Sequence, residues 1–520
     1  MDFLRKLLDV TRNQNFYISF LLLNLPYFFF LLPCLSADNI SPDFVIGATG
    51  KFLVPTYVLS LFFYRTNEKV RSAVLLLTGI VSVLDICCGL LLHQPFYLSY
   101  LPSLLGTNAR ESSEFLQVHL EASLENVLLV ACCVPMLLPS VRARIFRIWQ
   151  DIYDHNYKTV ALFSVFFACA YFWGAASHLL ETRLPMGNNL LRLSLDAVQT
   201  YQAERPAHDK VIPTVTSYDD SIPYIVVVLG ESANKHHHAV YGYELPTTPW
   251  ADAEQAKGNL AVYTDALATQ HFTIAAVKDI FSMRHAGDKE AFESVPNIFD
   301  YLKQTSYQSV WLSNQENVGV IGSFEKSIAS ECDTHEFTHP ASANSDSNPV
   351  YDEALLPLLD KQLETGGQRQ FILLHLMGSH QWAKNRCPNE FKRFTAEDES
   401  IQADVPADAK QMRAEYDNSI LYTDDVIGEI TERFKDKDAL VVYLSDHGED
   451  VYDYEFTHFA GHSPQGSDEE LYVPFYVWGS QVFQAQHPDI WLELQKKKNQ
   501  RLMTDSFPEF LWQILRLQTD

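Results

Sequence analysis

Acidic and histidine side chains in the C-terminal half of the sequence stand where apolar runs end. Glu231 follows the run Tyr224–Leu229 closely, and Asp446 and His447 follow Ala439–Leu444. Carboxylate oxygens and imidazole nitrogens are ligands of zinc, and a catalytic zinc site keeps one coordination position open. These residues therefore predict a zinc site, and its candidate ligands or close neighbours are Glu231, His380, Asp446, His447, His458 and His462.

A hydroxyl group beside such a metal would be a candidate nucleophile, because a metal cation lowers the pKa of a hydroxyl group that binds to it. Thr264, Thr269 and Thr273 lie close together in the sequence, and residue type alone does not separate them. Thr273 precedes a short alanine-containing helix start, where backbone N–H groups can bind phosphate oxygens. A purely structural alternative for Thr273 is a helix N-cap.

Several of these polar residues also have structural interpretations. A glutamate at the end of a strand is more often a helix cap or a solvated charge, and His458 could simply pack between aromatic residues. His375 lies inside an apolar run and is interpreted as a core histidine. The run His236–His238 is interpreted as a surface cluster and not as a metal site. The shared strand-end position of the candidate ligands favours the metal interpretation.

The elements that carry these residues alternate between strand-like and helix-like patterns. Continuous apolar runs are typical of strands buried on both faces, so the pattern predicts an α/β domain with a mostly parallel sheet. In such sheets functional groups gather at the carboxyl ends of the strands. Pro474 makes the last strand an edge strand or an interrupted one. The predicted strands are Tyr224–Leu229, Ser309–Leu312, Phe371–Leu376, Ala439–Leu444 and Leu471–Trp478, and helices are predicted over Pro296–Lys303 and Gln411–Phe434.

The N-terminal part of the 520-residue chain has a different character, because long apolar runs dominate it up to about residue 180. A membrane-spanning helix needs about 20 mostly apolar residues. The predicted membrane domain, residues 1–180, has five such segments: Phe16–Leu35, Phe44–Tyr64, Ala73–Tyr97, Leu124–Leu138 and Val160–Leu180. Residues 181–222 are predicted to be a linker, and residues 223–520 a catalytic domain.

Basic residues set the predicted orientation, since cytoplasmic loops are enriched in lysine and arginine. They cluster before the first segment, between the second and third, and between the fourth and fifth: Arg5, Lys6, Arg12, Arg65, Lys69, Arg71, Arg142, Arg144 and Arg147. An odd number of spans then places residues after about 181 outside, which in a bacterium is the periplasm. The net charge of −26 argues against a nucleic acid partner.

Two further features leave alternatives open. The outward loop from about Gln94 to Ala122 carries Thr107, Glu111 and Glu114, which could belong to an interfacial helix or could hold a lipid headgroup. Of the eight cysteines, only Cys332 and Cys387 lie in the predicted outward half, and the sequence alone does not decide whether they pair.

A series of motifs runs through the predicted catalytic domain in a fixed order. They are Val228–Ser232 with Tyr241–Tyr243 and Thr247–Pro249, Thr273 with Phe281 and Ser282, Trp311–Gln315, Met377–His380, Tyr416–Ile420 with Tyr422–Asp424, and Ser445–Glu449. In this combination the chain resembles the bacterial phosphoethanolamine transferases of the alkaline-phosphatase and sulfatase superfamily. The resemblance covers essentially the whole chain and implies an alkaline-phosphatase-like fold for the outward domain.

The resemblance also implies residue roles. The tightly held Zn²⁺ would lie among Glu231, Thr273, Asp446 and His447, and Thr273 would be the nucleophile that accepts phosphoethanolamine from phosphatidylethanolamine. His380 and His462, with His458 as the alternative to His462, would bind the phosphate group or a second zinc ion. Thr107 and Glu111 would hold the ethanolamine headgroup of the donor lipid.

The acceptor implied by the resemblance is lipopolysaccharide or lipooligosaccharide. Members that modify lipid A carry cysteines beside the nucleophile, and the segment around Thr273 has none. Asn234 and Lys235 stand where the family often has an arginine. Asn314 and Gln315 look more like the branch that modifies heptose of the lipopolysaccharide core. We therefore expect a core heptose ahead of lipid A, and a monomeric, multi-pass enzyme of the Gram-negative inner membrane.

Three other functions are weighed against this one. A sulfatase needs a cysteine or serine in a C-x-P-x-R context, and neither Cys332 nor Cys387 has it. A glycerophosphate transferase or a phosphodiesterase, including a transferase with a protein or glycan acceptor, would share the fold. A non-catalytic zinc-binding membrane sensor would need no nucleophile.

Overall fold

The computed structural model of the protein describes residues 209–520, except 289, 316–321, 339–349, 381–382, 401–408, 454–459 and 462–466, together with a few isolated positions between 69 and 144. Thr107, Glu111, His458 and His462 lie outside the described residues, as do nearly all of the five predicted spans. Among the described residues, no helix has both the length and the apolar character needed to cross a membrane. The chain divides into two compact units, and residues 203–520 belong to the second.

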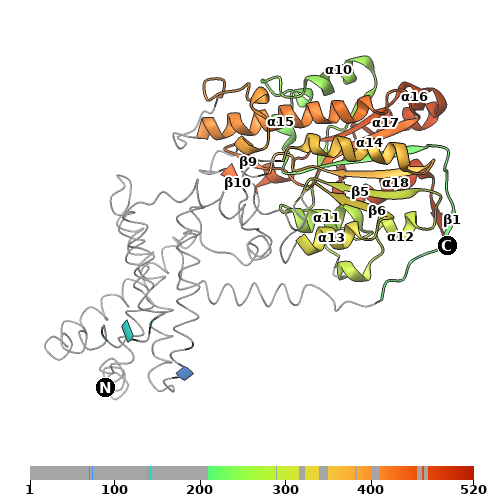
Figure 1. Ribbon diagram of the computed structural model, residues 1–520, viewed down its shortest axis with the longest axis horizontal. Coiled ribbons are helices and arrows are strands. Elements are labelled where there is room, and N and C mark those ends of the chain that lie inside the picture. The colour runs from blue at the N-terminus through green and yellow to red at the C-terminus, as the bar shows by residue number, and fades with distance from the viewer. Residues whose placement is uncertain are drawn as a thin grey trace. The chain divides into compact units, whose positions relative to one another are not determined.

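A seven-stranded sheet forms the centre of this second unit (Figure 1). Its strand order is β3-β11-β8-β2-β7-β5-β6. The strands from β8 to β6 are parallel, whereas β11 runs antiparallel to both of its neighbours. The predicted α/β class is confirmed, with a mixed sheet. The strands are β3 (Leu260–Val262), β11 (Phe475–Gly479), β8 (Ala439–Ser445), β2 (Tyr224–Gly230), β7 (Gln370–His375), β5 (Gln308–Ser313) and β6 (Thr334–Phe337).

The strand predicted over Leu471–Trp478 is shorter than expected. β11 begins at Phe475, immediately after Pro474. Proline has no backbone N–H to donate to a sheet, so pairing starts only at the following residue. The alternative of an edge strand is wrong, because β11 lies between β3 and β8. The short edge strands β3 and β6 have no counterpart among the predicted strands.

Each central strand contributes side chains to two separate cores, because successive residues of a strand point to opposite faces. In β2, Ile225, Val227 and Leu229 pack into one core. Val226 and Val228 pack into the other. The continuous apolar run of β2 thus reflects burial on both faces, as in parallel sheets covered by helices.

Helices cover both faces of the sheet (Figure 1). One core is closed by α11 (Thr273–Phe281), α12 (Ile298–Leu302), α13 (Gly322–Ala329), α16 (Gln481–Gln486), α17 (Pro488–Lys497) and α18 (Phe507–Leu515). The other core is closed by α10 (Pro249–Lys257), α14 (Leu355–Thr365) and α15 (Ala409–Glu432). Both predicted helices are confirmed, and Asn297 and Asp300 form a capping box that starts α12.

The two cysteines of this unit lie in different cores. Cys332 packs into the core that contains α11, and Cys387 packs into the core that contains α15. Both are free thiols. The central sheet separates them, which answers the question that the sequence left open.

Three short strand pairs complete the unit. β1 (Val215–Ser217) pairs with β13 (Gln518–Thr519), so an ordered strand lies inside the segment predicted to be a linker. β4 (Ala266–Leu267) pairs with β12 (Leu502–Met503). β9 (Asp450–Val451) pairs with β10 (Ala460–Gly461), shortly after the Asp446–His447 pair.

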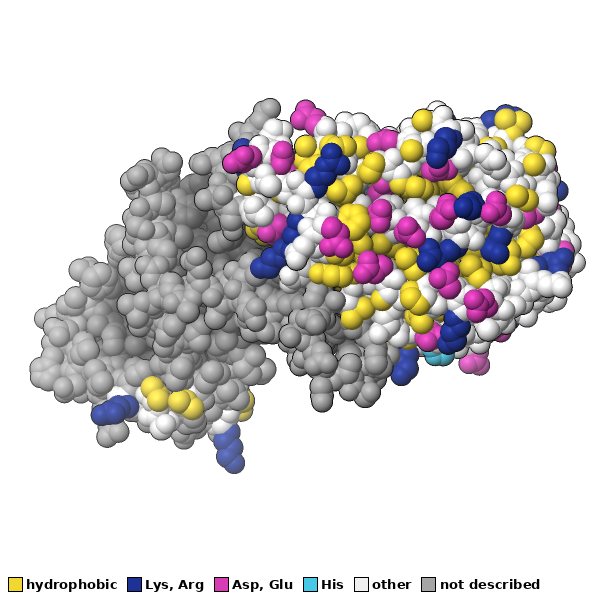
Figure 2. All heavy atoms as spheres, turned by 45° about the horizontal axis from the view of Figure 1, so that its top comes forward, with side chains coloured by type: hydrophobic (Ala, Val, Ile, Leu, Met, Phe, Trp, Pro, Cys, Tyr) yellow, Lys and Arg dark blue, Asp and Glu magenta, His cyan; other side chains and the backbone are white. Residues whose placement is uncertain are grey.

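Charged side chains on the face shown in Figure 2 are mixed in sign, with acidic and basic groups interspersed among apolar ones. Surface ion pairs such as Arg433 with Asp360, 2.8 Å apart, typically contribute about 0–1 kcal/mol. Buried charged groups have larger effects, because their removal leaves an uncompensated charge in the interior.

Candidate active site

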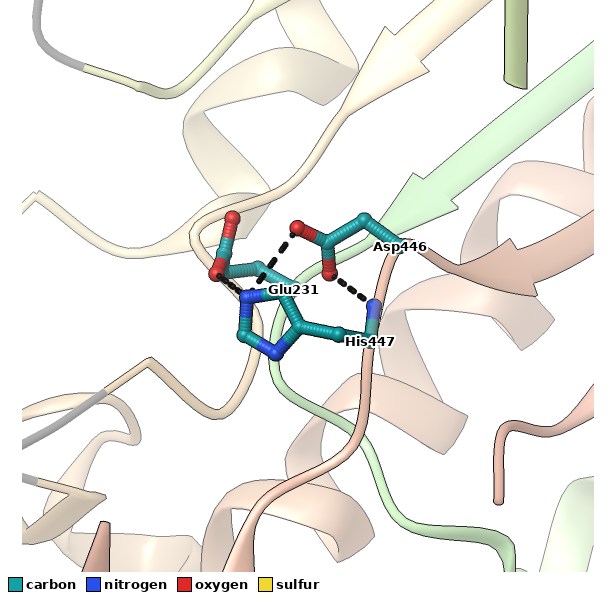
Figure 3. A group of neighbouring side chains, drawn as sticks. All are labelled: Glu231, Asp446 and His447. Atoms are coloured by element: carbon teal, nitrogen blue, oxygen red, sulfur yellow. Dashed lines mark hydrogen bonds and ion pairs between the residues drawn. The ribbon is translucent and has the colours of Figure 1, made fainter. Parts of the chain in front are cut away.

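Glu231, Asp446 and His447 meet at the carboxyl ends of β2 and β8 (Figure 3). The two strands are parallel neighbours, and their pairing places Gly230 opposite Ser445. The residues that follow each strand therefore emerge side by side. One ligand atom from each of the three residues lies within 4.8 Å of the others. All three side chains are buried, with at most 1% of their surface exposed.

The backbone around the triad fixes how these side chains point. Asp446 Oδ1 accepts hydrogen bonds from the backbone N–H of Ser232 at 3.2 Å and of His447 at 2.8 Å. His447 Nδ1 lies 2.9 Å from the carbonyl oxygen of Gly448 and donates to it. With Nδ1 engaged in this way, Nε2 faces Glu231 Oε1 at 3.2 Å and Asp446 Oδ2 at 3.3 Å.

This donor set fits a zinc ion. Asp446 Oδ2 is buried and accepts no hydrogen bond from any residue in the described part of the chain. A histidine that binds metal commonly donates its other ring N–H to a backbone carbonyl, as His447 does. Two carboxylates and one imidazole leave a fourth tetrahedral position open, which is the arrangement of catalytic zinc sites.

Electrostatics at the triad also favour a bound cation. Burial lowers the pKa of His447, but Asp446 and Glu231 outweigh burial and raise this pKa to about 10. Burial and the charge of Glu231 raise the pKa of Asp446 to about 7. Burial also raises the pKa of Glu231, yet His447 holds it below its usual value. In the absence of metal the site thus retains a proton on His447, which a metal ion would have to displace.

Thr273 lies against the triad. It is the first residue of α11, and its Oγ1 is 3.0 Å from Glu231 Oε1 and 3.2 Å from His447 Nε2. Phe272 occupies the N-cap position, so the N-cap alternative for Thr273 is wrong. Thr269 Oγ1 donates instead to Asp279 Oδ2 at 3.0 Å. Thr264 Oγ1 lies near the carbonyl of Lys498, and only Thr273 of the three candidates reaches the triad.

His380 follows β7 on a loop that crosses the triad. The backbone N–H of Ser379 donates to the carbonyl of Glu231 at 2.9 Å. Gly378 has φ +54°, and a Cβ at this position would lie 2.8 Å from the backbone of Glu231. Glycine permits both the left-handed conformation and this close approach. The charge of His380 helps to lower the pKa of Glu231, although the structure does not group His380 with the three ligands.

Two further residues hold the site and were not among the predicted site residues. Gln315 Nε2 lies 3.4 Å from Glu231 Oε2 and donates to the carbonyl of Leu376 at 2.8 Å. The sequence feature that could have identified Gln315 as a site residue is its position close to the end of a predicted strand. Asp352 accepts the backbone N–H groups of Met377 and Gly378, at 2.7 and 2.9 Å, and so supports the loop that carries His380. Asp352 Oδ1 also accepts a hydrogen bond from Asn314 Nδ2 at 2.8 Å. No sequence pattern singles out Asp352, because these partners lie 25 to 38 residues away in the sequence.

The helix α15 supports the loops of the site from one side. Tyr416 Oη donates to the carbonyl of Ser232 at 2.7 Å and accepts from the backbone N–H of Asn234 at 2.8 Å. Ser419 Oγ lies 2.9 Å from Ser379 Oγ, in the loop that precedes His380. One rigid helix thus contacts the segment after Glu231 and the segment before His380.

The interpretation of His236–His238 as a surface cluster is wrong for two of its members. His237 is fully buried and His238 is 2% exposed, whereas His236 is exposed. The partners of His237, Asp417 and Asp453, lie far from it in the sequence. The run of three histidines alone therefore could not predict that His237 is buried. His375 is buried inside β7, as predicted, and its ring is nearly perpendicular to that of Trp311.

Comparison with known proteins supports these observations. The family model described as Sulfatase matches residues 223–513. The phosphoethanolamine transferase EptC of Escherichia coli O18:K1:H7 is 23% identical over 466 residues, which cover 83% of this chain and 78% of that protein.

Two solved structures share the fold. The crystal structure of the C-terminal periplasmic domain of E. coli EptC in complex with Zn has a TM-score of 0.55 at 23% identity, covering 60% of this chain and 88% of that one. The integral membrane protein lipooligosaccharide phosphoethanolamine transferase A from Neisseria meningitidis has a TM-score of 0.66 at 18% identity, covering 97% of this chain and 94% of that one.

Proposed function

The chain belongs to the sulfatase family, and from this premise we propose that it is a zinc-dependent phosphoethanolamine transferase with Thr273 as its nucleophile. The observation that carries the proposal is the position of Thr273 Oγ1, 3.0 Å from Glu231 and 3.2 Å from His447 at the start of α11. The similarity to a phosphoethanolamine transferase over most of the chain supports the same activity.

Glu231, Asp446 and His447 would hold the zinc ion, and a zinc ion here would lower the pKa of the Thr273 hydroxyl and offset negative charge on the phosphate. Thr273 Oγ1 attacks the phosphorus of phosphatidylethanolamine. The bond between phosphorus and the diacylglycerol oxygen breaks, and diacylglycerol leaves with the proton released by Thr273. Ethanolamine phosphate remains bonded to Thr273 as a covalent intermediate.

An acceptor hydroxyl then attacks the same phosphorus. The bond to Thr273 Oγ1 breaks, and Thr273 regains a proton as the product leaves. The first backbone N–H groups of α11 have no partners within the helix and can bind the non-bridging phosphate oxygens. His380, together with His462 or His458, stabilises charge on these oxygens or assists proton transfer. Thr107 and Glu111 hold the ethanolamine group of the donor.

The acceptor is a lipopolysaccharide or lipooligosaccharide, with a core heptose ahead of lipid A. The enzyme is a monomer of the inner membrane, with residues 1–180 as its membrane domain and residues 223–520 in the periplasm. Support for heptose comes from the lack of cysteines around Thr273 and from Asn314 and Gln315, which resemble the branch that modifies core heptose. Formylglycine chemistry is disfavoured, because Thr273 is neither a cysteine nor a serine.

Intact-mass analysis tests the nucleophile. Purified full-length protein incubated with labelled phosphatidylethanolamine should gain one ethanolamine phosphate group, and peptide mapping should place it on Thr273. Thr273→Ala should gain none while it still binds zinc. Full transferase activity of Thr273→Ala, or an adduct on another residue, would contradict the proposal.

Mass spectrometry of lipopolysaccharide tests the acceptor. Cells that express the protein should carry ethanolamine phosphate on a core heptose, and cells with Thr273→Ala should not. Ethanolamine phosphate on lipid A would agree with the proposed transferase activity but would identify lipid A, not a core heptose, as the acceptor. Release of free ethanolamine phosphate would instead indicate a phosphodiesterase, and zinc binding without turnover would indicate a sensor.

A further inference from the structure

A second buried cluster, of a histidine and two aspartates, lies outside the candidate metal site. His237 ends the short helix η1 (Lys235–His237) and is fully buried. Its Nδ1 lies 2.5 Å from Asp417 Oδ1, and its Nε2 lies 3.0 Å from Asp453 Oδ2. An ionised carboxylate can only accept hydrogen bonds, so each ring nitrogen must carry a proton. Burial lowers the pKa of His237, but Asp453 and Asp417 outweigh burial and raise this pKa to about 10, so His237 is an imidazolium ion.

The two aspartates come from different parts of the fold. Asp417 belongs to α15, and its Oδ2 also accepts a hydrogen bond from Tyr243 Oη at 2.7 Å. Asp453 follows β9, where its Oδ2 accepts the backbone N–H of Val451 at 3.1 Å. His237 thus joins a helix to the turn after β9.

The charges of this cluster balance. Arg413 lies 2.8 Å from Asp453 Oδ1, so two cations, His237 and Arg413, face two aspartates. Glu399 is 3.4 Å from Arg413, and burial together with Asp417 raises the pKa of Glu399 to about 8. This raised pKa favours the neutral form of the Glu399 carboxyl group at pH 7. A buried ion-pair cluster is tolerated when its charges are matched in this way.

The sequence positions of the cluster connect it to the metal triad. His237 lies six residues after Glu231, and Asp453 lies six residues after His447. The two segments also contact each other directly: Ala233 N–H donates to Ser445 Oγ at 2.9 Å, and Asn234 Nδ2 donates to the carbonyl of Glu449 at 3.2 Å. The ion pair between His237 and Asp453 joins the same two segments again, six residues beyond Glu231 and His447.

We propose that His237 is a positioning residue for the metal site, because its ion pairs with Asp417 and Asp453 fix the segment after Glu231 against the segment after His447. The inference rests on the zinc site of the proposed function. Neutral hydrogen bonds such as those of Ala233 and Asn234 contribute about 1 kcal/mol each. The buried ion pairs supply the stronger connection, and the spacing of Glu231, Asp446 and His447 depends on it.

His238 provides a matched control. It is adjacent to His237 and also buried, but its Nδ1 lies 2.6 Å from Tyr476 Oη, and it pairs with no carboxylate in the part of the chain that the structure describes. Burial lowers the pKa of His238 to about 3, so it is neutral. Replacing His238 disturbs the same short segment without touching the connection to Asp417 and Asp453.

The experiment measures zinc affinity of the full-length protein by competition with a fluorescent zinc chelator, and thermal unfolding of the same samples without zinc. His237→Gln should bind zinc about tenfold more weakly, the lower end of the effect seen for groups that support metal ligands. His238→Gln should lower the unfolding temperature and leave zinc affinity within about twofold of the wild type.

A double variant, His237→Gln with Asp453→Asn, removes one cation and one anion together and keeps the charge balance, so it should fold even if His237→Gln does not. Its zinc affinity should match that of His237→Gln, because both substitutions remove the same ion pair between His237 and Asp453 and their effects should not add. Unchanged zinc affinity in the double variant, or equal losses in His237→Gln and His238→Gln, would overturn the inference. A wild-type protein that binds no zinc would overturn the proposed function as well.

Discussion

Two buried clusters each combine one histidine with two carboxylates, and they are built for different tasks. Both use the segments that follow β2 and β8, and α15 adds Asp417 to the second cluster. The triad of Glu231, Asp446 and His447 turns one histidine nitrogen, Nε2, toward both carboxylates. In the cluster of His237, Asp417 and Asp453, the two nitrogens face carboxylates on opposite sides of the ring.

The difference lies in what completes each cluster. His447 Nδ1 donates to the carbonyl of Gly448, and Asp446 Oδ2 is left without a hydrogen bond among the described residues. Around His237, Tyr243 and Arg413 supply donors to the aspartates. Converging ligand atoms with an unfilled acceptor indicate a cation site, whereas satisfied acceptors and matched charges indicate a structural ion-pair cluster.

Substitution of Asp446 should give the largest effect and tests whether the triad is a cation site. Asp446→Asn should reduce transferase activity by about 10³-fold or more, because a metal ion supplies several kcal/mol of transition-state stabilisation. The unfolding temperature without zinc should stay level or rise, since one of two adjacent buried carboxylates loses its charge and the amide oxygen can still accept the two backbone N–H groups. Activity assays and calorimetry check both outcomes, and a large loss of stability without zinc would place Asp446 in a structural role.

Asp453→Asn should behave in the opposite way. Removing this charge leaves His237 and Arg413 facing one aspartate, and breaking a buried ion pair typically costs about 3 kcal/mol of unfolding free energy. With zinc at saturating concentration, activity should remain within about threefold of the wild type. Denaturant unfolding and activity at several zinc concentrations separate the two effects, and a loss of activity that zinc cannot restore would contradict the assignment.

The charge on His237 predicts a dependence on pH. Burial lowers the pKa of His237, but Asp453 and Asp417 outweigh it and raise the pKa to about 10, against 6.5 in the unfolded chain. Its stabilising effect is therefore complete below pH 6.5 and is lost as the pH rises toward 10.

Between pH 6.5 and 8, the stability advantage of the wild type over His237→Gln should shrink by about 2 kcal/mol, at 1.36 kcal/mol per pH unit. Urea unfolding of the zinc-saturated proteins across this range provides the measurement. A constant difference would mean that His237 is not charged.

The smallest expected effect is at Tyr243. Tyr243→Phe removes a hydrogen bond to Asp417 and leaves both ion pairs of His237 in place. The unfolding free energy should fall by about 1.5 kcal/mol, as is usual for a hydrogen bond to a charged group. Zinc affinity should not change. A drop in zinc affinity as large as that of His237→Gln would show that the whole cluster, rather than the ion pairs, positions the metal site.

Much of the fold could be predicted from the sequence, because its signals are local. The apolar runs of β2, β5, β7 and β8 and the helical pattern of α15 are periodic within each segment, and periodicity follows directly from backbone geometry. The same apolar runs also predict that Glu231 lies at the end of one strand and that Asp446 and His447 lie at the end of another. A mixed sheet could not be foreseen, since the direction of β11 is set by its connections.

The sequence by itself determined the α/β class, the strand ends that present Glu231, Asp446 and His447, and the residue types suited to zinc. Residue type left Thr264, Thr269 and Thr273 open, and the family resemblance implied Thr273. Only the tertiary structure decided that Thr273 reaches the triad. It also decided that His237 is buried and that Gln315 and Asp352 support the site. The physical reason is the distance along the chain: Asp446 bonds to Ser232 across 214 residues, and a partner so remote is chosen by strand register and packing, which no local pattern encodes.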